Sequence, residues 1–224
     1  MEVLKQSFFN RNAPLVARDL LGKVIRVSSP EGFLAAEIIE TEAYDFQDQA
    51  SHGSKKCTPS REALWMEPGT IYMYYCRGAA SLNVSVQGEG CAVLVKSAYP
   101  YFLKDPKREL AQMQKHNPKP DQSRRSIAQL CKGQTLLCKS LNITVEKYNK
   151  QALHPDGLAL FNVGNRVEEI IDTTRLGLGD YDDQYLWYRY INAKMAQHCT
   201  SNPLSKKSLT PGVDYALTRW FLED

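Results

Sequence analysis

The chain has 224 residues, of which 43% are hydrophobic and 24% are charged. These proportions are ordinary for a soluble globular protein and exclude a largely disordered chain, and the length is enough to bury one substantial core. The formal charge of +3 is only mildly basic, so the total charge names no class of partner, and we expect a single domain over residues 1–224.

The six cysteines form no CxxC pair, and the opening run MEVLKQSFFN lacks the apolar core of a secretion signal. These features argue against a zinc site, a disulfide framework and a leader peptide. No later run approaches the ~20 apolar residues that cross a bilayer. We therefore expect no metal, no membrane segment and a reducing intracellular compartment.

The first fifth of the chain predicts a helix and then a β-hairpin. In the run RNAPLVARDLLGK, Asn12 can cap a helix, Pro14 suits its first turn, and Gly22 ends it. The runs KVIRVSS (residues 23–29) and FLAAEIIETEAY (residues 33–44) flank the turn signal PEG. Such runs pair as an antiparallel hairpin.

A second β region follows after a possible short helix at Arg61–Met66. The runs IYMYYC (residues 71–76), LNVSV (residues 82–86) and CAVLVKSA (residues 91–98) are apolar and β-prone, and QGEG between the last two is a tight turn. Strands joined by short turns pair antiparallel.

The remainder mixes helices and strands. Residues 105–141 read as short helices broken at Gly133, GLALFNV (residues 157–163) and LWYRYI (residues 186–191) read as strands, and the last fifteen residues, from Thr210, read as a closing helix. The sum predicts an α+β fold in which helices flank a curved antiparallel sheet.

Polar and aromatic side chains fall on shared faces of two predicted strands. Alternation places Glu40, Glu42 and Tyr44 on one side of their strand, and Tyr72 and Tyr74 on one side of theirs. If these faces converge, they enclose carboxylates between flat aromatic walls. A planar ligand would fit such a cavity.

Two more residues join this group, and each member has an ordinary alternative. Asn83 alternates away from its apolar neighbours, and His52 ends the loop after the first tyrosine. A tyrosine in a strand is commonly an edge of the core, a strand glutamate commonly faces solvent, and a loop histidine is commonly a surface group. Taken singly, none of these residues indicates a site.

One segment is locally basic. Between Lys104 and Arg125 seven cations face three acids, a surplus of four (seven minus three), and Lys132, Lys139 and further lysines extend it. Such a segment can lie along a phosphate backbone. A solvated helical surface is the commoner reason for a charge run, and both readings stay open.

Taken together and in order, the motifs resemble the alkyladenine (3-methyladenine) DNA glycosylase family. The likeness covers most of the chain to about Ile191 and is weak beyond Asn192. The matching runs are VARDLLGK, ETEAY with its downstream His52, TPS at Thr58, MEPGTIYMYY (residues 66–75), LNVSVQGEGCAVLVK (residues 82–96) and TRLGLG (residues 174–179).

The resemblance implies a monofunctional enzyme of base excision repair. Such an enzyme flips an alkylated or deaminated purine from duplex DNA and hydrolyses its N-glycosidic bond with a Glu-activated water. By position, Glu42 resembles the catalytic carboxylate, and Tyr44, His52 and Tyr74 are similar to the residues that sandwich and border the flipped base. Asn83 resembles the amide that selects against the exocyclic amino group of guanine.

The chain departs from the family pattern at two positions expected to bind DNA. Where the family normally has a wedge tyrosine, the run IYMYYCRGAASLN places Arg77. Where the family usually has an arginine, Lys96 keeps the charge but loses the bidentate fork.

The expected partner is double-stranded DNA with a damaged purine, bound by a monomer that works with the DNA in the cytoplasm, nucleoid or nucleus. No cofactor is expected, and no lysine is placed for Schiff-base chemistry, so we expect no lyase action. Two other readings stay open. One is a damage-binding protein of the same fold with weakened catalysis. The other is a hydrolase of free nucleosides or sugars that uses Glu40 and Glu42 as a pair.

Overall fold

The computed structural model describes residues 1–76, 78–179 and 182–219, with the side chains of all but residues 182 and 183. Its strands are β1 (Glu2–Val3), β2 (Val24–Ser29), β3 (Gly32–Tyr44), β4 (Ile71–Cys76), β5 (Ala79–Ser85), β6 (Ala92–Pro100), β7 (Leu158–Asn162), β8 (Glu169–Thr173), β9 (Arg189–Asn192) and β10 (Tyr215–Arg219). Its α-helices are α1 (Gln6–Phe9), α2 (Ala13–Asp19), α3 (Pro106–His116), α4 (Ile127–Leu130), α5 (Gln134–Ser140) and α6 (Val145–Tyr148). Short 3-10 helices are η1 (Glu62–Trp65), η2 (Asp182–Tyr185), η3 (Ala193–His198) and η4 (Pro203–Ser205).

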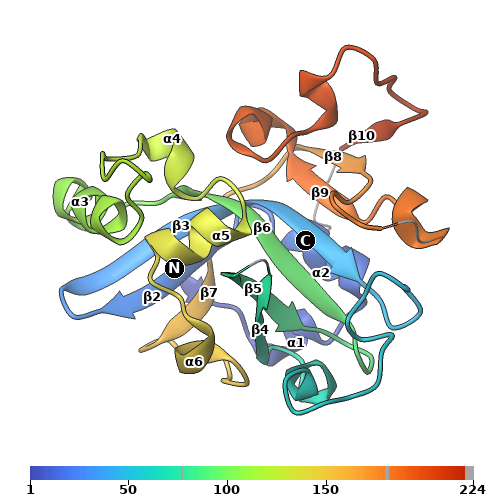
Figure 1. Ribbon diagram of the computed structural model, residues 1–224, viewed down its shortest axis with the longest axis horizontal. Helices are drawn as coiled ribbons and strands as arrows, with labels where there is room; N and C mark the ends of the chain where they lie inside the picture. The colour runs from blue at the N-terminus through green and yellow to red at the C-terminus, as the bar shows by residue number, and fades with distance from the viewer. Residues whose placement is uncertain (77, 180–181, 220–224) are drawn as a thin grey trace.

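The strands of the described residues form one antiparallel sheet, which confirms the predicted α+β class (Figure 1). The main path runs β1-β7-β2-β3-β6-β5-β4. The central strand β3 pairs with β6 along one edge, and along its other edge it pairs first with β2 and then with β9. The sheet therefore branches at β3, and β9, β8 and β10 form the branch.

Helices cover both faces of this sheet (Figure 1). Behind it, α2 begins at Asn12, whose Oδ1 accepts from the Leu15 amide at 3.0 Å, and ends before Gly22 at φ +80°, as the sequence predicted. The Thr41 hydroxyl donates to Ala17 O at 2.8 Å and ties α2 to β3. In front, α5 packs on β5 and β6. Within the described ranges, no helix is long and apolar enough to cross a membrane.

A β-bulge interrupts β3 where its pairing passes from β2 to β9. The register with β6 shifts between Ile38 and Glu40 and again between Glu40 and Thr41. A bulge bends the strand and re-aims the side chains beside it. The bulge therefore changes which β6 residue lies beside Glu40, whereas the pairing with β9 runs regularly from Glu40 to Glu42.

The C-terminal part differs most from the sequence-based expectation. The closing helix predicted from Thr210 is wrong for the described residues, because β10 pairs with β8 and residue Gly212 turns at φ +80° instead. Tyr215 is buried and packs with Ile39 and Ile171 in a small second core. The strand β8 was not expected, and β9 is shorter than the predicted run.

Candidate active site

A cavity of about 720 Å³ opens between the ends of β3, β4 and β5 and the start of α5. Of the predicted site residues, Glu42 does not line it, and five do, namely Tyr44, His52, Tyr74, Asn83 and Lys96. Its volume lies in the range of about 300–1,000 Å³ that is usual for ligand sites. The aromatic part of the predicted cavity is therefore present, whereas neither Glu40 nor Glu42 lines it.

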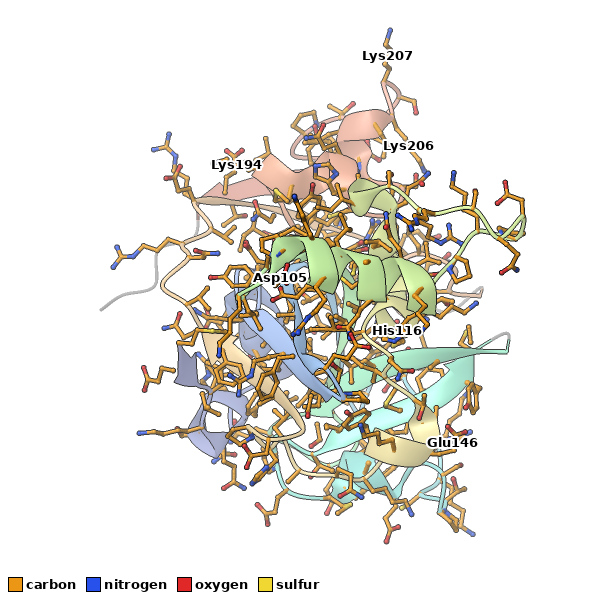
Figure 2. The ribbon with its side chains drawn as sticks, turned by 90° about the vertical axis from the view of Figure 1, so that its left-hand side faces the viewer. Asp105, His116, Glu146, Lys194, Lys206 and Lys207 are labelled. Atoms are coloured by element: carbon orange, nitrogen blue, oxygen red, sulfur yellow. The ribbon has the colours of Figure 1, made fainter. Side chains whose placement is uncertain are left out.

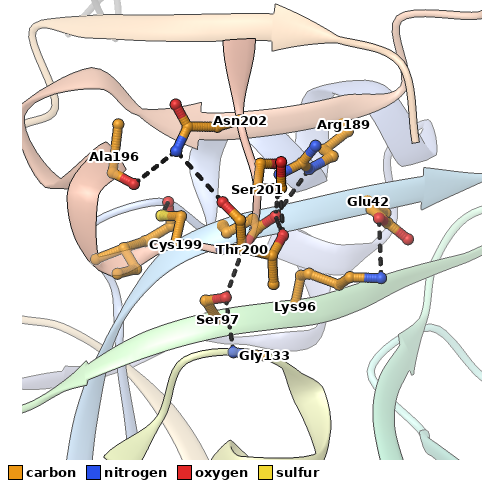
Figure 3. Close-up of polar contacts among 12 residues, drawn as sticks. Glu42, Lys96, Ser97, Gly133, Arg189, Ala196, Cys199, Thr200, Ser201 and Asn202 are labelled. Atoms are coloured by element: carbon orange, nitrogen blue, oxygen red, sulfur yellow. Dashed lines mark hydrogen bonds and ion pairs between the residues drawn. The ribbon is translucent and has the colours of Figure 1, made fainter. Parts of the chain in front are cut away.

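Glu42 lies directly behind this wall and is fully buried. The Tyr44 hydroxyl donates to Glu42 Oε2 at 2.7 Å. The Lys96 ammonium lies 3.2 Å from Oε1 (Figure 3). No donor among the described residues is aligned for a hydrogen bond to Oε1. This oxygen therefore has an ion-pair partner but no hydrogen-bond donor among the described residues.

An aromatic cluster forms one side of the cavity. The His52 and Tyr74 ring centroids lie 4.5 Å apart, and Tyr72 and Tyr74 stack at 5.4 Å with an interplanar angle of 30°. His52 Nδ1 and the Tyr72 hydroxyl share a hydrogen bond of 2.7 Å. Tyr72 therefore holds both His52 and Tyr74 in place. The sequence put Tyr72 on the same strand face as Tyr74 but gave it no role of its own.

Asn83 is set deep in the same wall. It pairs with Tyr72 on β4 and with Leu94 on β6, and its Nδ2 donates to Tyr72 O at 3.2 Å. Only 4% of the residue is exposed. The amide is held by a backbone bond, so its orientation is set before any ligand enters.

Arg175 is the main residue of this region that the sequence analysis missed. Its guanidinium donates to Ala43 O at 3.0 Å, pairs with the buried Asp48 carboxylate, and lies over the Tyr44 ring at 4.7 Å. It thus joins the end of β3 to the loop that carries His52. The signal was available, because Arg175 stands inside the TRLGLG run.

Burial shifts the pKa of the tyrosines and of the histidine in the wall. Burial, reinforced by the charge and hydrogen bond of Glu42, raises the pKa of Tyr44 well above its usual value, so the phenol remains a donor. Burial lowers the pKa of His52, and Arg61 and Lys55 lower it further. His52 is therefore neutral at neutral pH.

The profile of the family described as methylpurine-DNA glycosylase matches residues 7–196. The chain belongs to this family. A protein of Pseudomonas syringae pathovar tomato is 47% identical over 213 residues, 95% of each chain. One from Pseudomonas aeruginosa is 44% identical over 215 residues, 96% of this chain and 90% of the relative. One from Prosthecochloris aestuarii is 32% identical over 212 residues, 91% of this chain and 96% of the relative.

All three relatives carry the provisional name 3-methyladenine DNA glycosylase. Membership places the chain among DNA glycosylases, which hydrolyse an N-glycosidic bond and act in DNA repair. The alignment with these relatives also extends beyond Asn192, where the sequence motifs alone gave only a weak match. The resemblance drawn from the sequence is thereby confirmed.

Neither glutamate of β3 lines the cavity, and Glu40 lies in a different set of contacts from Glu42. Its carboxylate accepts from Arg189 Nε at 2.7 Å and from the Thr200 hydroxyl at 2.6 Å, and the Ser97 hydroxyl donates to it as well (Figure 3). All of these contacts lie in a closed, buried network. The reading in which Glu40 and Glu42 act as a catalytic pair loses its geometric basis, because Glu40 has no open position.

Arg77 lies outside the described residues, and its neighbours Cys76 and Gly78 line the cavity. The other predicted DNA contact, Lys96, is largely withdrawn into the cavity wall, with 15% of its side chain exposed. In this structure the Lys96 ammonium faces Glu42, so a contact with the DNA backbone stays a prediction.

The basic segment of residues 104–125 contributes no side chain to the cavity of this glycosylase. It includes α3, which lies at one side of the sheet, and Figure 2 shows Asp105 and His116 marking its ends. The exposed cations at the cavity are instead Lys132 and Lys139, beside and within α5.

Proposed function

We propose that this glycosylase excises alkylated or deaminated purines, such as 3-methyladenine, ethenoadenine or hypoxanthine, from duplex DNA. The damaged nucleotide flips into the cavity, and Glu42 activates the water that breaks the N-glycosidic bond. One observation carries the proposal: the Tyr44 hydroxyl holds the buried Glu42 carboxylate at 2.7 Å, at the wall of a cavity lined by aromatic rings.

The aromatic residues supply the base-binding surface. A ring-alkylated purine is electron-poor and often cationic, so it stacks on tyrosine faces with about 1 kcal/mol or more of cation–π attraction once desolvated. Tyr44 and Tyr74 provide such faces, and His52 borders them. The Asn83 amide, fixed by Tyr72 O, selects against a guanine amino group.

Glu42 performs the chemistry in this proposal. A cationic base is a good leaving group, so one carboxylate as general base is sufficient for it, whereas an ordinary glycoside needs an acid partner. Oε1 can receive the proton of water, and the carboxylate stabilises positive charge on the sugar. The proposed enzyme is monofunctional: water, and not a protein side chain, replaces the base on the sugar.

Lys96 has two effects on Glu42. Its ammonium supplies a counter-charge to the buried Glu42 carboxylate. It also covers Oε1 at 3.2 Å, so a shift of its flexible side chain lets the attacking water in.

Duplex DNA with a damaged purine is the proposed partner of a monomeric enzyme that works wherever the cell keeps its DNA. The exposed Lys132 and Lys139 offer phosphate contacts beside the cavity, and Arg77 and Lys96 are the other proposed DNA contacts. Flipping costs a few kcal/mol of stacking and pairing. We propose Arg77 as the group that fills the vacated space.

Release of the modified base from duplexes containing 3-methyladenine, ethenoadenine or hypoxanthine tests this function. The enzyme is expected to release at least one of them in a single-turnover assay. Binding to damaged DNA with no release of any of the three would contradict it and favour the damage-binding alternative.

A further inference from the structure

Arg175 and Asp48 form an ion pair directly behind the cavity wall. Both side chains are buried, with 0% and 1% exposed, and the Arg175 guanidinium also donates to Ala43 O at 3.0 Å. Residues 176–178, which follow Arg175, and residues 50–52, just beyond Asp48, line the cavity, whereas neither member of the pair lines it. The pair can therefore act on a bound base only through the wall.

The guanidinium acts on the cavity through the ring of Tyr44. It lies over this ring, 4.7 Å from the centroid, and Tyr44 lines the cavity. Because Arg175 is buried and lines no part of the cavity, its cation lies on the face of the ring that points away from a ligand. Burial and the charge of Glu42 raise the pKa of Tyr44, and the charge of Arg175 opposes them. The positive charge therefore acts on the phenol ring.

A cation behind an aromatic ring weakens the attraction of a second cation to the front of that ring. The face of a ring binds cations because it is negative, and the guanidinium draws this charge toward the buried face. The guanidinium also repels a like charge directly. A base that stacks about 3.5 Å in front of Tyr44 lies roughly 8 Å from the guanidinium, where one charge changes a binding constant by roughly tenfold or more at an effective dielectric constant of about 20. The carboxylate of Asp48 cancels part of this repulsion.

The charges at the cavity itself act in the same direction. Among the described residues that line it, three are lysines, Lys96, Lys132 and Lys139, and none is an acid. Glu42 lies behind the wall, and the Lys96 ammonium, 3.2 Å away, already balances its charge. A cationic base therefore meets like charges in this cavity, whereas a neutral base does not lose affinity to them.

We propose that the Arg175–Asp48 pair sets the balance between cationic and neutral lesions: the guanidinium weakens the stacking of cationic purines on Tyr44, and the carboxylate limits that penalty. The inference rests on the proposed function, because that function places the flipped base on Tyr44. Neutral lesions such as ethenoadenine and hypoxanthine gain relative to cationic ones. Both members of the pair act through Tyr44, so they are positioning residues and not catalytic ones.

The test compares two duplexes that differ only in the charge of the lesion. One carries 3-methyladenine, which is cationic while it is attached to the sugar, and the other carries its neutral isostere 3-deaza-3-methyladenine. Both have a 2′-fluoro sugar that resists hydrolysis, because the fluorine opposes the positive charge that develops on C1′. The affinity of the full-length enzyme for each duplex is measured by titration. The ratio of the two affinities cancels the phosphate contacts, which both duplexes share.

Two variants are expected to move this ratio in opposite directions. Asp48→Asn leaves the guanidinium without its counter-charge, so the affinity for the cationic duplex relative to the neutral one should fall roughly three- to tenfold. Arg175→Gln leaves the carboxylate instead, so the ratio should rise by a similar factor. A loss of structure alone weakens both affinities, and it leaves the ratio unchanged or moves it the same way in both variants.

Asp172→Asn is the matched control. Arg18 lies over the Tyr190 ring at 4.4 Å and pairs with Asp172, and none of these three residues lines the cavity. The same change of charge behind a different tyrosine should leave the ratio at its wild-type value. An unchanged ratio in Asp48→Asn, or a change in the same direction in Asp48→Asn and Arg175→Gln, overturns the proposal.

The wild-type ratio gives a second readout that is independent of how well a variant folds. An unopposed cation–π contact favours the cationic duplex by about fivefold or more. We expect the wild type to bind the cationic duplex no more than about threefold better than the neutral one, and a larger preference overturns the proposal. Release of damaged bases from unmodified sugars, measured separately, decides the proposed function, so the two failures are distinguishable.

Discussion

Glu40 and Glu42 stand two residues apart on β3, and both are fully buried, yet they have opposite surroundings. Glu40 accepts bonds from Arg189, Thr200 and Ser97 on three other segments, and those contacts use both of its oxygens. Glu42 has one phenol and one ammonium as partners, and no described residue donates a hydrogen bond to its Oε1. The number of donors around a buried carboxylate therefore separates a structural anchor from a candidate base.

The β-bulge and the branch of the sheet produce this difference. The bulge shifts the register around Glu40, and β9 pairs there and brings Arg189 onto it. The Ser97 hydroxyl, which bonds Glu40, also accepts from the Gly133 amide at 3.0 Å. Glu40 thus joins the branch to the start of α5, where Gly133 lines the cavity.

The largest expected effect is on Glu42→Gln, which keeps the size of the side chain and removes the base. Release of 3-methyladenine in a single-turnover assay is expected to slow by about 10²- to 10⁴-fold, a usual range for a lost general base. DNA binding, measured by titration, is expected to persist. Glu40→Gln is the matched control on the same strand, and undiminished release in Glu42→Gln would sink the assignment.

Glu40→Gln is expected to lower the free energy of unfolding. It is expected to leave the rate of base release per folded molecule unchanged. It leaves the buried Arg189 guanidinium without its counter-charge, which costs about 3 kcal/mol or more in comparable pairs. The midpoint of thermal unfolding should fall by roughly 6–12 °C, while Glu42→Gln should shift it less. Equal midpoints for the two variants would erase the distinction between the two glutamates.

The same pair predicts a pH dependence. Burial alone favours the neutral form of Glu40, but Arg189 and the hydrogen bonds of Ser97 and Thr200 outweigh it and lower its pKa below the ordinary 4.5. A lowered folded pKa stabilises the protein above the unfolded value and loses that stabilisation as the pH falls. The midpoints of thermal unfolding of the wild type and of Glu40→Gln should therefore approach each other as the pH falls below about 4.5. A difference between the midpoints that stays constant in this range would contradict the ion pair.

The smallest expected effect is on DNA binding, and it distinguishes the lysines beside the cavity from those on α3. Lys139→Ala, beside the cavity, should weaken DNA binding several-fold and reduce the salt slope of the binding constant by about 1, as the loss of one phosphate contact does. Lys107→Ala on α3 should leave the slope unchanged. Fluorescence titrations at several salt concentrations measure both, and the reverse result would move the DNA path onto α3.

Local sequence patterns predicted much of the fold. The cap at Asn12 and the stop at Gly22 bounded α2, the PEG turn set the β2–β3 hairpin, and Gly133 marked the start of α5. Each of these depends on neighbours in sequence. The strand β10 was missed because Thr210 and Pro211 suit a helix start, whereas pairing with β8 gives that segment its burial partner.

The sequence by itself determined the family, the strands that carry Glu42, Tyr44, Tyr74 and Asn83, and the residue types that line one cavity. Only the tertiary structure decided that Glu40 is closed off, that Arg175 backs Tyr44, and that Lys96 pairs with Glu42. Alternation and capping act over a few residues, so a sequence displays them. A bulge, a branching strand and an ion pair across strands depend on which distant segments meet, and that is settled only when the chain packs.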